Sequence, residues 1–167
     1  MNHPIDTAHD YVTILEEVSG IFPSLDSDVA AVAALSFAMA QLASAHLNKD
    51  ADDNAEAGVL AAITATAVTY AKMKGCDDPW DAMRKEYEHA KAKHGDPTFD
   101  NPDMPFDQKY MALAEEVGEV AAAQTYDNAD DTGHQAHLVE EIIQVAGLAA
   151  AWIAGIVEVH NSEEESK

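Results

Sequence analysis

The sequence predicts an all-α protein, a bundle of about five or six helices. Hydrophobic residues make up 47% of the 167 residues but aromatic residues only 7%, which favours close packing of helix on helix. Apolar residues recur at spacings of three and four, the period of one helix face. Breaks that contain proline or glycine separate these stretches. The chain is long enough for one domain with a sizeable buried core.

Residues 1–76 are expected to form an N-terminal helical extension. A short helix is predicted over Asp6–Gly20, ended by Gly20 and the following proline. Asp26–Asp28 offers N-cap side chains for an Ala-rich helix that runs to about Asn48. After the turn Lys49–Asn54, a second Ala-rich helix ends near Lys74, so these two helices are predicted to form an αα-hairpin.

Residues 77–160 are expected to form a helical core, followed by a frayed acidic tail at 161–167. Pro79 suits the first turn of a helix that ends at about His94. Three prolines exclude a regular helix from Asp96–Asp107. The next helices are predicted from Phe106 to about Tyr126 and from His134 to about His160, joined by a polar turn.

The last two predicted helices carry matching apolar seams. Positions in the last helix alternate spacings of four and three, as in a packed bundle: Leu138, Ile142, Val145, Ala149, Trp152, Ile156 and Val159. The preceding helix has Leu113, Val117 and Val120 in the same pattern. Gly118 and Gly147 lie inside these helices and are expected to let two backbones approach closely.

The net charge of −22, from 31 acidic and 9 basic residues, argues against binding to nucleic acid or to an anionic membrane. It would also repel a nucleoside triphosphate unless divalent cations intervened. The single cysteine, Cys76, excludes an internal disulfide. The N-terminal residues lack the basic and apolar regions of a signal peptide, so we expect a cytoplasmic protein.

Two polar pairs border the seams. Glu116 and Glu119 are spaced i, i+3, as are Glu141 and Gln144, and residues at this spacing share one helix face. Each of these residues precedes a seam position by one. Two such faces turned toward each other would offer oxygen ligands to Mg²⁺. The alternative is that these acids belong to the ordinary solvated faces of amphipathic helices.

Residues 110–120 (YMALAEEVGEV) and 140–145 (EEIIQV) resemble the two signatures of the MazG-like, all-α nucleoside triphosphate pyrophosphohydrolases, E-x-x-E and E-x-x-D. The likeness covers about Trp80 to Val159. It implies a MazG-like core, a homo-oligomer, and cleavage of a nucleoside triphosphate to the monophosphate and pyrophosphate. The cofactor implied is Mg²⁺, with Mn²⁺ as a substitute.

The resemblance assigns catalysis and metal binding to Glu116, Glu119 and Glu141. Gln144 stands where the family usually has aspartate, as a neutral metal ligand or a neighbour of the ligands. Lys109 is the candidate to contact substrate phosphates, with three other cations near the site in sequence: Arg84, Lys91 and Lys93.

The sequence leaves other interpretations open. Because Gln144 brings no charge, the chain is alternatively a non-catalytic helical module that binds a nucleotide or a protein partner, or a structural oligomerisation protein. His134, His137 and Glu141 have a spacing that can hold a transition metal. Glu86 and His89 have the spacing of a di-iron bundle, but a second Glu-x-x-His is absent from the sequence.

Overall fold

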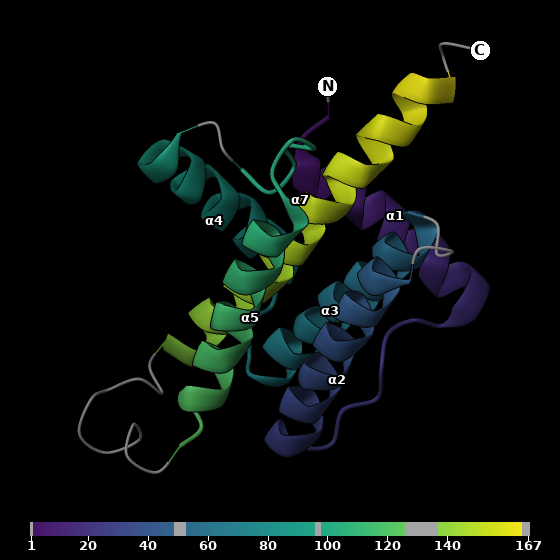
Figure 1. The fold of residues 1–167 in the computed structure, drawn as a ribbon. Helices are drawn as coiled ribbons and strands as arrows, with labels where there is room; N and C mark the ends of the chain where they lie inside the picture. Colours follow the sequence, from purple (N-terminus) through teal and green to yellow (C-terminus); the bar gives the residue numbers. More distant parts are fainter. Residues whose placement is uncertain (1, 49–52, 96–97, 126–136, 165–167) are drawn as a thin grey trace.

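The computed structural model describes residues 2–48, 53–95, 98–125 and 137–164 (Figure 1). These residues form six helices and contain no strand, which confirms the all-α prediction. The helices are α1 (Pro4–Ser19), α2 (Asp28–Leu47), α3 (Asp53–Met73), α4 (Pro79–His94), α5 (Phe106–Ala122) and α7 (Leu138–Glu164).

Three helix starts follow from capping. His3 Nδ1 accepts a hydrogen bond from Ile5 N (3.2 Å), so α1 begins at Pro4, two residues earlier than expected. Ser27 Oγ accepts from Ala30 N (3.2 Å) at the start of α2. Asp78 Oδ1 accepts from Asp81 N (3.0 Å) at the start of α4. Each side chain satisfies a backbone donor that the first turn leaves unpaired.

The ends of the last two helices differ from the sequence prediction. Helix α5 ends at Ala122 rather than near Tyr126, and a turn follows over residues 123–125. Helix α7 continues to Glu164, so the expected frayed tail is helical over residues 161–164. The polar turn at 127–133, the start of the last helix at His134, and residues 165–167 lie outside the described residues.

Helix α7 is the centre of the fold. It packs against α1, α3, α4 and α5, while α2 lies on the outside against α3 and α5 (Figure 1). The seam residues of α5 are buried, as are the first five of α7, whereas Ile156 and Val159 near the C-terminus are partly exposed. One continuous hydrophobic core runs from Ile5 in α1 to Ile153 in α7. The three N-terminal helices therefore share their core with α4, α5 and α7.

Two helices are long and apolar enough to cross a membrane, judged by length and composition alone: α2 and residues 138–162 of α7. This is weak evidence, because the core helices of soluble proteins have the same properties. Helix α7 is 67% buried within the bundle, whereas only 28% of α2 is buried.

Candidate metal centre

Three glutamates from two helices converge at one edge of the bundle. Glu116 and Glu119 lie on α5 and Glu141 lies on α7, and one carboxylate oxygen from each is within 4.8 Å of the others. The neighbouring residues Val117 and Ile142 are buried in the core. Because these apolar neighbours hold α5 against α7, the carboxylates that border the seams are held together.

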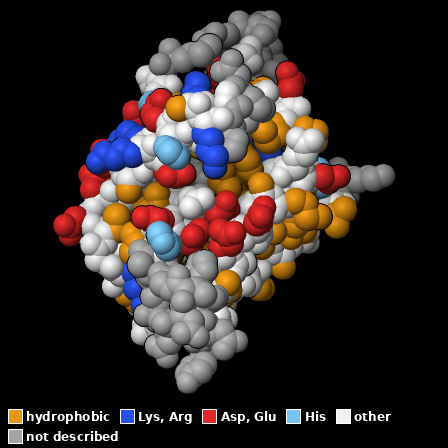
Figure 2. Space-filling view, turned by 90° about the vertical axis from the view of Figure 1, so that its left-hand side faces the viewer, with side chains coloured by type: hydrophobic (Ala, Val, Ile, Leu, Met, Phe, Trp, Pro, Cys, Tyr) orange, Lys and Arg blue, Asp and Glu red, His pale blue; other side chains and the backbone are white. Residues whose placement is uncertain are grey.

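The degree of burial distinguishes this cluster from a solvated helix face. Glu116 and Glu141 are partly buried, while Glu119 is exposed. The side of the molecule that carries α4 and α5 shows a patch of Asp and Glu side chains (Figure 2). Ordinary surface glutamates on separate helices keep apart in water, because like charges repel. The arrangement therefore costs free energy unless a cation or proton is present.

The pKa values of two of the glutamates are raised, as expected for carboxylates that are costly to ionise. Burial, followed by the charges of Glu119 and Glu141, raises the pKa of Glu116 from 4.5 to about 7. Burial also raises the pKa of Glu141, with a hydrogen bond to Glu119 and its charge as further causes. Desolvation and neighbouring negative charge both favour the protonated acid.

The cluster also lacks a positive partner. Glu116 Oε2 is buried and accepts no hydrogen bond. Within the part of the chain that the structure describes, no Lys or Arg forms a salt bridge with any of the three glutamates. Buried acceptors are normally satisfied. Oxygen donors without a counter-charge are the donor set that a hard divalent cation prefers, so the residues present fit Mg²⁺.

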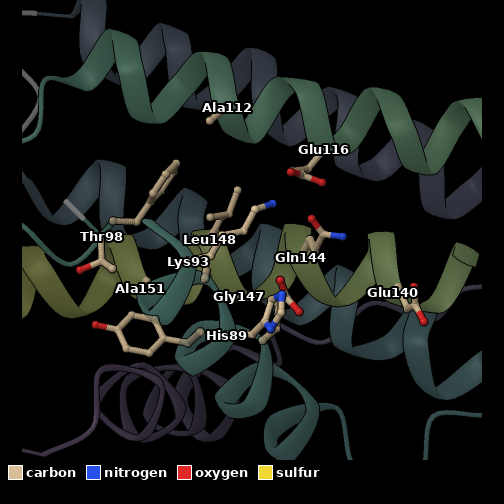
Figure 3. Close-up of a pocket in the computed structure, with 14 residues that line it drawn as sticks. His89, Lys93, Thr98, Ala112, Glu116, Glu140, Gln144, Gly147, Leu148 and Ala151 are labelled. Carbon is tan, nitrogen blue, oxygen red and sulfur yellow. The ribbon is translucent and has the colours of Figure 1, made fainter. Parts of the chain in front are cut away.

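Gln144 lies one helical turn after Glu141 and borders the cluster. Its Nε2 donates a hydrogen bond to Glu141 Oε2 (3.3 Å). Glu116 from α5 and Gln144 from α7 point toward each other across the gap between the helices (Figure 3). The amide nitrogen therefore orients Glu141, and the amide oxygen remains a neutral acceptor beside the carboxylates.

A pocket of about 600 Å³ adjoins the cluster, and Glu116 and Gln144 form part of its wall (Figure 3). Its other walls come from α4, from Thr98 and Phe99, and from the middle of α7. Ala112, Leu148 and Ala151 make one side apolar, while Glu86, His89 and Lys93 bring polar groups. The volume is in the range of small-molecule sites.

The predicted phosphate-binding cations lie in different places. Lys93 lines the pocket. Lys109 is 4% exposed and its Nζ lies 5.6 Å from the centre of the Trp152 ring. Burial lowers the pKa of Lys109 to about 8. Arg84 pairs with Asp6 on α1 (Nε to Oδ1 2.6 Å). Of these lysines and arginines, Lys93 has the position closest to the predicted role, and substrate contact by Lys109 stays a prediction.

The contacts that hold the segment before α5 against α7 were not predicted from the sequence. A Cβ on Gly155 of α7 would lie 2.6 Å from the backbone oxygen of Asp100. The Asp100 side chain accepts a hydrogen bond from Tyr87 OH (3.0 Å). Gly155 thus lets the segment that carries Phe99 lie directly on α7 and line the pocket. A glycine inside an apolar helix pattern was the only signal in the sequence.

The expectation that Gly118 and Gly147 let two backbones approach closely was wrong. A Cβ on Gly118 would have no neighbour within 4 Å, and one on Gly147 would make an ordinary contact with Met83 Cγ at 4.0 Å. Neither position requires glycine for packing within this chain, because both have room for a methyl group.

The other two sets of residues with metal-ligand spacing, His134/His137/Glu141 and Glu86/His89, do not form a comparable cluster in the described residues. His137 Nδ1 and Glu140 Oε2 are 2.8 Å apart, and His134 lies outside the described residues. Glu86 and His89 both line the pocket. The carboxylate cluster of Glu116, Glu119 and Glu141 is therefore the better-formed candidate for a metal ion.

Comparison of the chain with protein-family models, with curated proteins and with solved structures found no match. The function is accordingly argued from the geometry and chemistry of the site.

Proposed function

We propose that this protein is a Mg²⁺-dependent nucleoside triphosphate pyrophosphohydrolase of the MazG-like kind, which converts a nucleoside triphosphate and water to the monophosphate and pyrophosphate. One observation carries the proposal: three carboxylates from facing helices meet within 4.8 Å beside a pocket of about 600 Å³. Glu116 belongs to both the cluster and the pocket wall.

The charge of the chain supports a metal-dependent phosphate site. With a net charge of −22, the protein repels a polyphosphate unless cations lie between them. Mg²⁺, when bound, would neutralise phosphate oxygens and lower the pKa of a bound water. Glu116, Glu119 and Glu141 would hold the ion, and the Gln144 amide would orient Glu141.

The residues of the pocket would bind the substrate, and the glutamates would assist the attack of water. Lys93 on the pocket wall would contact phosphate oxygens, and the apolar residues with Phe99 would contact the nucleoside. Water attacks the α-phosphorus while one glutamate of the cluster accepts its proton. The bond from the α-phosphorus to the bridging oxygen breaks, and that oxygen leaves with pyrophosphate.

The test is an assay that measures pyrophosphate and phosphate separately across canonical and modified nucleoside triphosphates. We expect pyrophosphate in Mg²⁺ and no turnover in EDTA. Glu116→Gln should reduce turnover by about a hundredfold or more, because it removes a group at the reacting centre. Glu115→Gln, the exposed neighbour on the same helix, is the matched control and should keep full activity. Release of phosphate alone, or turnover that persists in EDTA, would refute the proposal.

A second function is favoured by Gln144. Because its amide replaces a carboxylate at the cluster, the protein is alternatively a module that binds a nucleotide or a protein partner without hydrolysis. Calorimetric titration with Mg²⁺, and then with nucleotides, separates the two functions. Nucleotide binding in Mg²⁺ without product formation would support the module, whereas product formation would exclude it.

A further inference from the structure

The part of the pocket wall that precedes α5 is a closed turn. Asn101 N donates a hydrogen bond to Thr98 O (2.9 Å), so residues 98–101 form a β-turn with Phe99 and Asp100 at its centre. Thr98 and Phe99 line the pocket. Because the turn is closed, a contact that holds Asp100 also sets the position of Phe99.

Tyr87 of α4 makes such a contact with the Asp100 side chain. Its hydroxyl donates a hydrogen bond to Asp100 Oδ1 (3.0 Å), and a bond to a charged acceptor is stronger than one between neutral groups. Burial raises the pKa of Tyr87 to about 12, so the hydroxyl keeps its proton at neutral pH. The Tyr87 side chain is buried, and the His3 ring packs edge-on against it with ring centres 5.1 Å apart. The donor is therefore fixed on α4 and the acceptor on the turn.

The turn and the carboxylate cluster lie at different ends of the pocket. Gln144 borders the cluster, and Ala151 follows it by seven residues on α7, or about 10 Å along the helix axis. Thr98 lies at the end of the pocket with Ala151, away from Gln144 (Figure 3). The Phe99 ring packs edge-on against the Trp152 ring, with centres 6.4 Å apart. A displacement of the turn therefore changes the apolar end of the pocket and leaves the carboxylates on α5 and α7 in place.

We propose that Tyr87 is a positioning residue for the nucleoside of the substrate: its hydroxyl acts through Asp100 and keeps Phe99 in place at the apolar end of the pocket. This role rests on the proposed function. It assigns the contact between Tyr87 and Asp100 to binding of the nucleoside, and it leaves binding of the phosphates to the metal-bound glutamates and Lys93. Without the hydroxyl, the backbone of the turn still rests on Gly155, but the turn loses its side-chain anchor on α4.

The first test is Tyr87→Phe, which removes only the hydroxyl. It should raise KM for a nucleoside triphosphate in Mg²⁺ by about fivefold or more and leave kcat within about twofold, because binding is lost and the reacting groups are untouched. Inorganic tripolyphosphate carries phosphates but no nucleoside, so its constant as a competitive inhibitor should stay unchanged. Tyr110→Phe is the matched control: its hydroxyl also bonds to another helix, at Met39 O (3.3 Å), and its loss should leave both constants at their wild-type values.

A double-mutant cycle tests whether Tyr87 acts through Asp100 or touches the substrate itself. Asp100→Ala removes the acceptor and should raise KM for the nucleoside triphosphate at least as much as Tyr87→Phe does. Tyr87→Phe added to Asp100→Ala should raise KM no further, because the hydroxyl has then already lost its partner. A hydroxyl that contacts the substrate directly would instead give additive effects.

Hydrogen exchange of the protein without metal or nucleotide gives a measurement that does not depend on activity. The Asn101 amide is protected by its bond to Thr98 O. It should exchange about fivefold faster or more in Tyr87→Phe than in the wild type, because the turn opens more often without its anchor. Tyr110→Phe should exchange at the wild-type rate at this amide. Circular dichroism verifies that both variants keep the helical fold.

The wild type and the Tyr87 variant distinguish a failure of this role from a failure of the proposed function. A wild type that neither binds nor cleaves a nucleoside triphosphate in Mg²⁺ would refute both. An active wild type would refute the role of Tyr87 alone if Tyr87→Phe leaves KM or the exchange of the Asn101 amide unchanged, or if its effect adds to that of Asp100→Ala. An inhibition constant for tripolyphosphate that rises together with KM would refute the assignment to the nucleoside, because the phosphate end would then be affected as well.

Discussion

Replacing Glu116 by glutamine should stabilise the metal-free protein while it lowers the proposed activity by about a hundredfold or more. The substitution keeps the shape of the side chain and removes one of three clustered charges. A rise in pKa from 4.5 to about 7 corresponds to a penalty of about 3 kcal/mol for the ionised form, at about 1.4 kcal/mol per pKa unit. Partial solvent exposure screens the charges, so we expect a gain of about 1–2 kcal/mol in the free energy of unfolding at pH 8. For a protein of this size that is an increase in Tm of about 3–6 °C.

The raised pKa of Glu116 also determines how the stability of the protein changes with pH. Because the folded pKa of Glu116 is raised, the stability that its protonation provides is present at low pH and is lost as pH rises through about 7. The wild type in EDTA should therefore lose stability between about pH 5 and 8, whereas Glu116→Gln should lose less. At pH 5 the two proteins should unfold at nearly the same temperature.

The assay is thermal unfolding by circular dichroism in EDTA from pH 5 to 8, repeated with Mg²⁺ at pH 8. Mg²⁺ should stabilise the wild type, because it binds only the folded cluster, and should have little effect on Glu116→Gln. Glu115→Gln controls for the general loss of one acid. The reasoning fails if Glu116→Gln is no more stable than the control at pH 8, or if Mg²⁺ stabilises it as much as the wild type.

Three further predictions follow from the site. Gln144→Asp adds a fourth acid, so Mg²⁺ affinity at pH 8 should rise by about tenfold; calorimetry measures this, and an unchanged affinity would place residue 144 outside the metal site. Gly155→Ala puts a methyl group 2.6 Å from the Asp100 backbone oxygen, so it should lower the free energy of unfolding by about 1–3 kcal/mol and raise KM by moving the pocket wall. An unchanged KM would show that this segment does not shape the substrate site. Lys93→Ala should raise KM by about tenfold through loss of a phosphate contact, and comparison with Lys109→Met tests which lysine meets the substrate; a raised KM for Lys109→Met alone would reverse the assignment.

The cluster shows a conflict between stability and the proposed function. Glu116 and Glu141 lie where the core ends, and the burial that raises their pKa values opposes their ionisation. Natural proteins accept such costs mainly at functional sites. This conflict is the strongest physical reason to prefer a cation site over a pair of solvated helix faces.

The sequence by itself determined the helices and most of their faces. Caps at Ser27 and Asp78, the proline at position 79 and the seam from Leu138 to Trp152 are local signals, and a helix needs little more than local signals to form. The i, i+3 spacing of Glu116 and Glu119 fixed which acids share a helix face. The acidic composition likewise fixed the need for a cation at any phosphate site.

Only the tertiary structure decided the distances between helices. How α5 crosses α7 determines that Glu141 comes within reach of Glu116 and Glu119, and how the chain before α5 rests on Gly155 determines where the pocket wall lies. The burial of Lys109 beside Trp152 and the exposure of Phe37 depend on which neighbours cover each helix. Periodicity gives the angle of a residue around its own helix, but packing between helices decides what that residue faces.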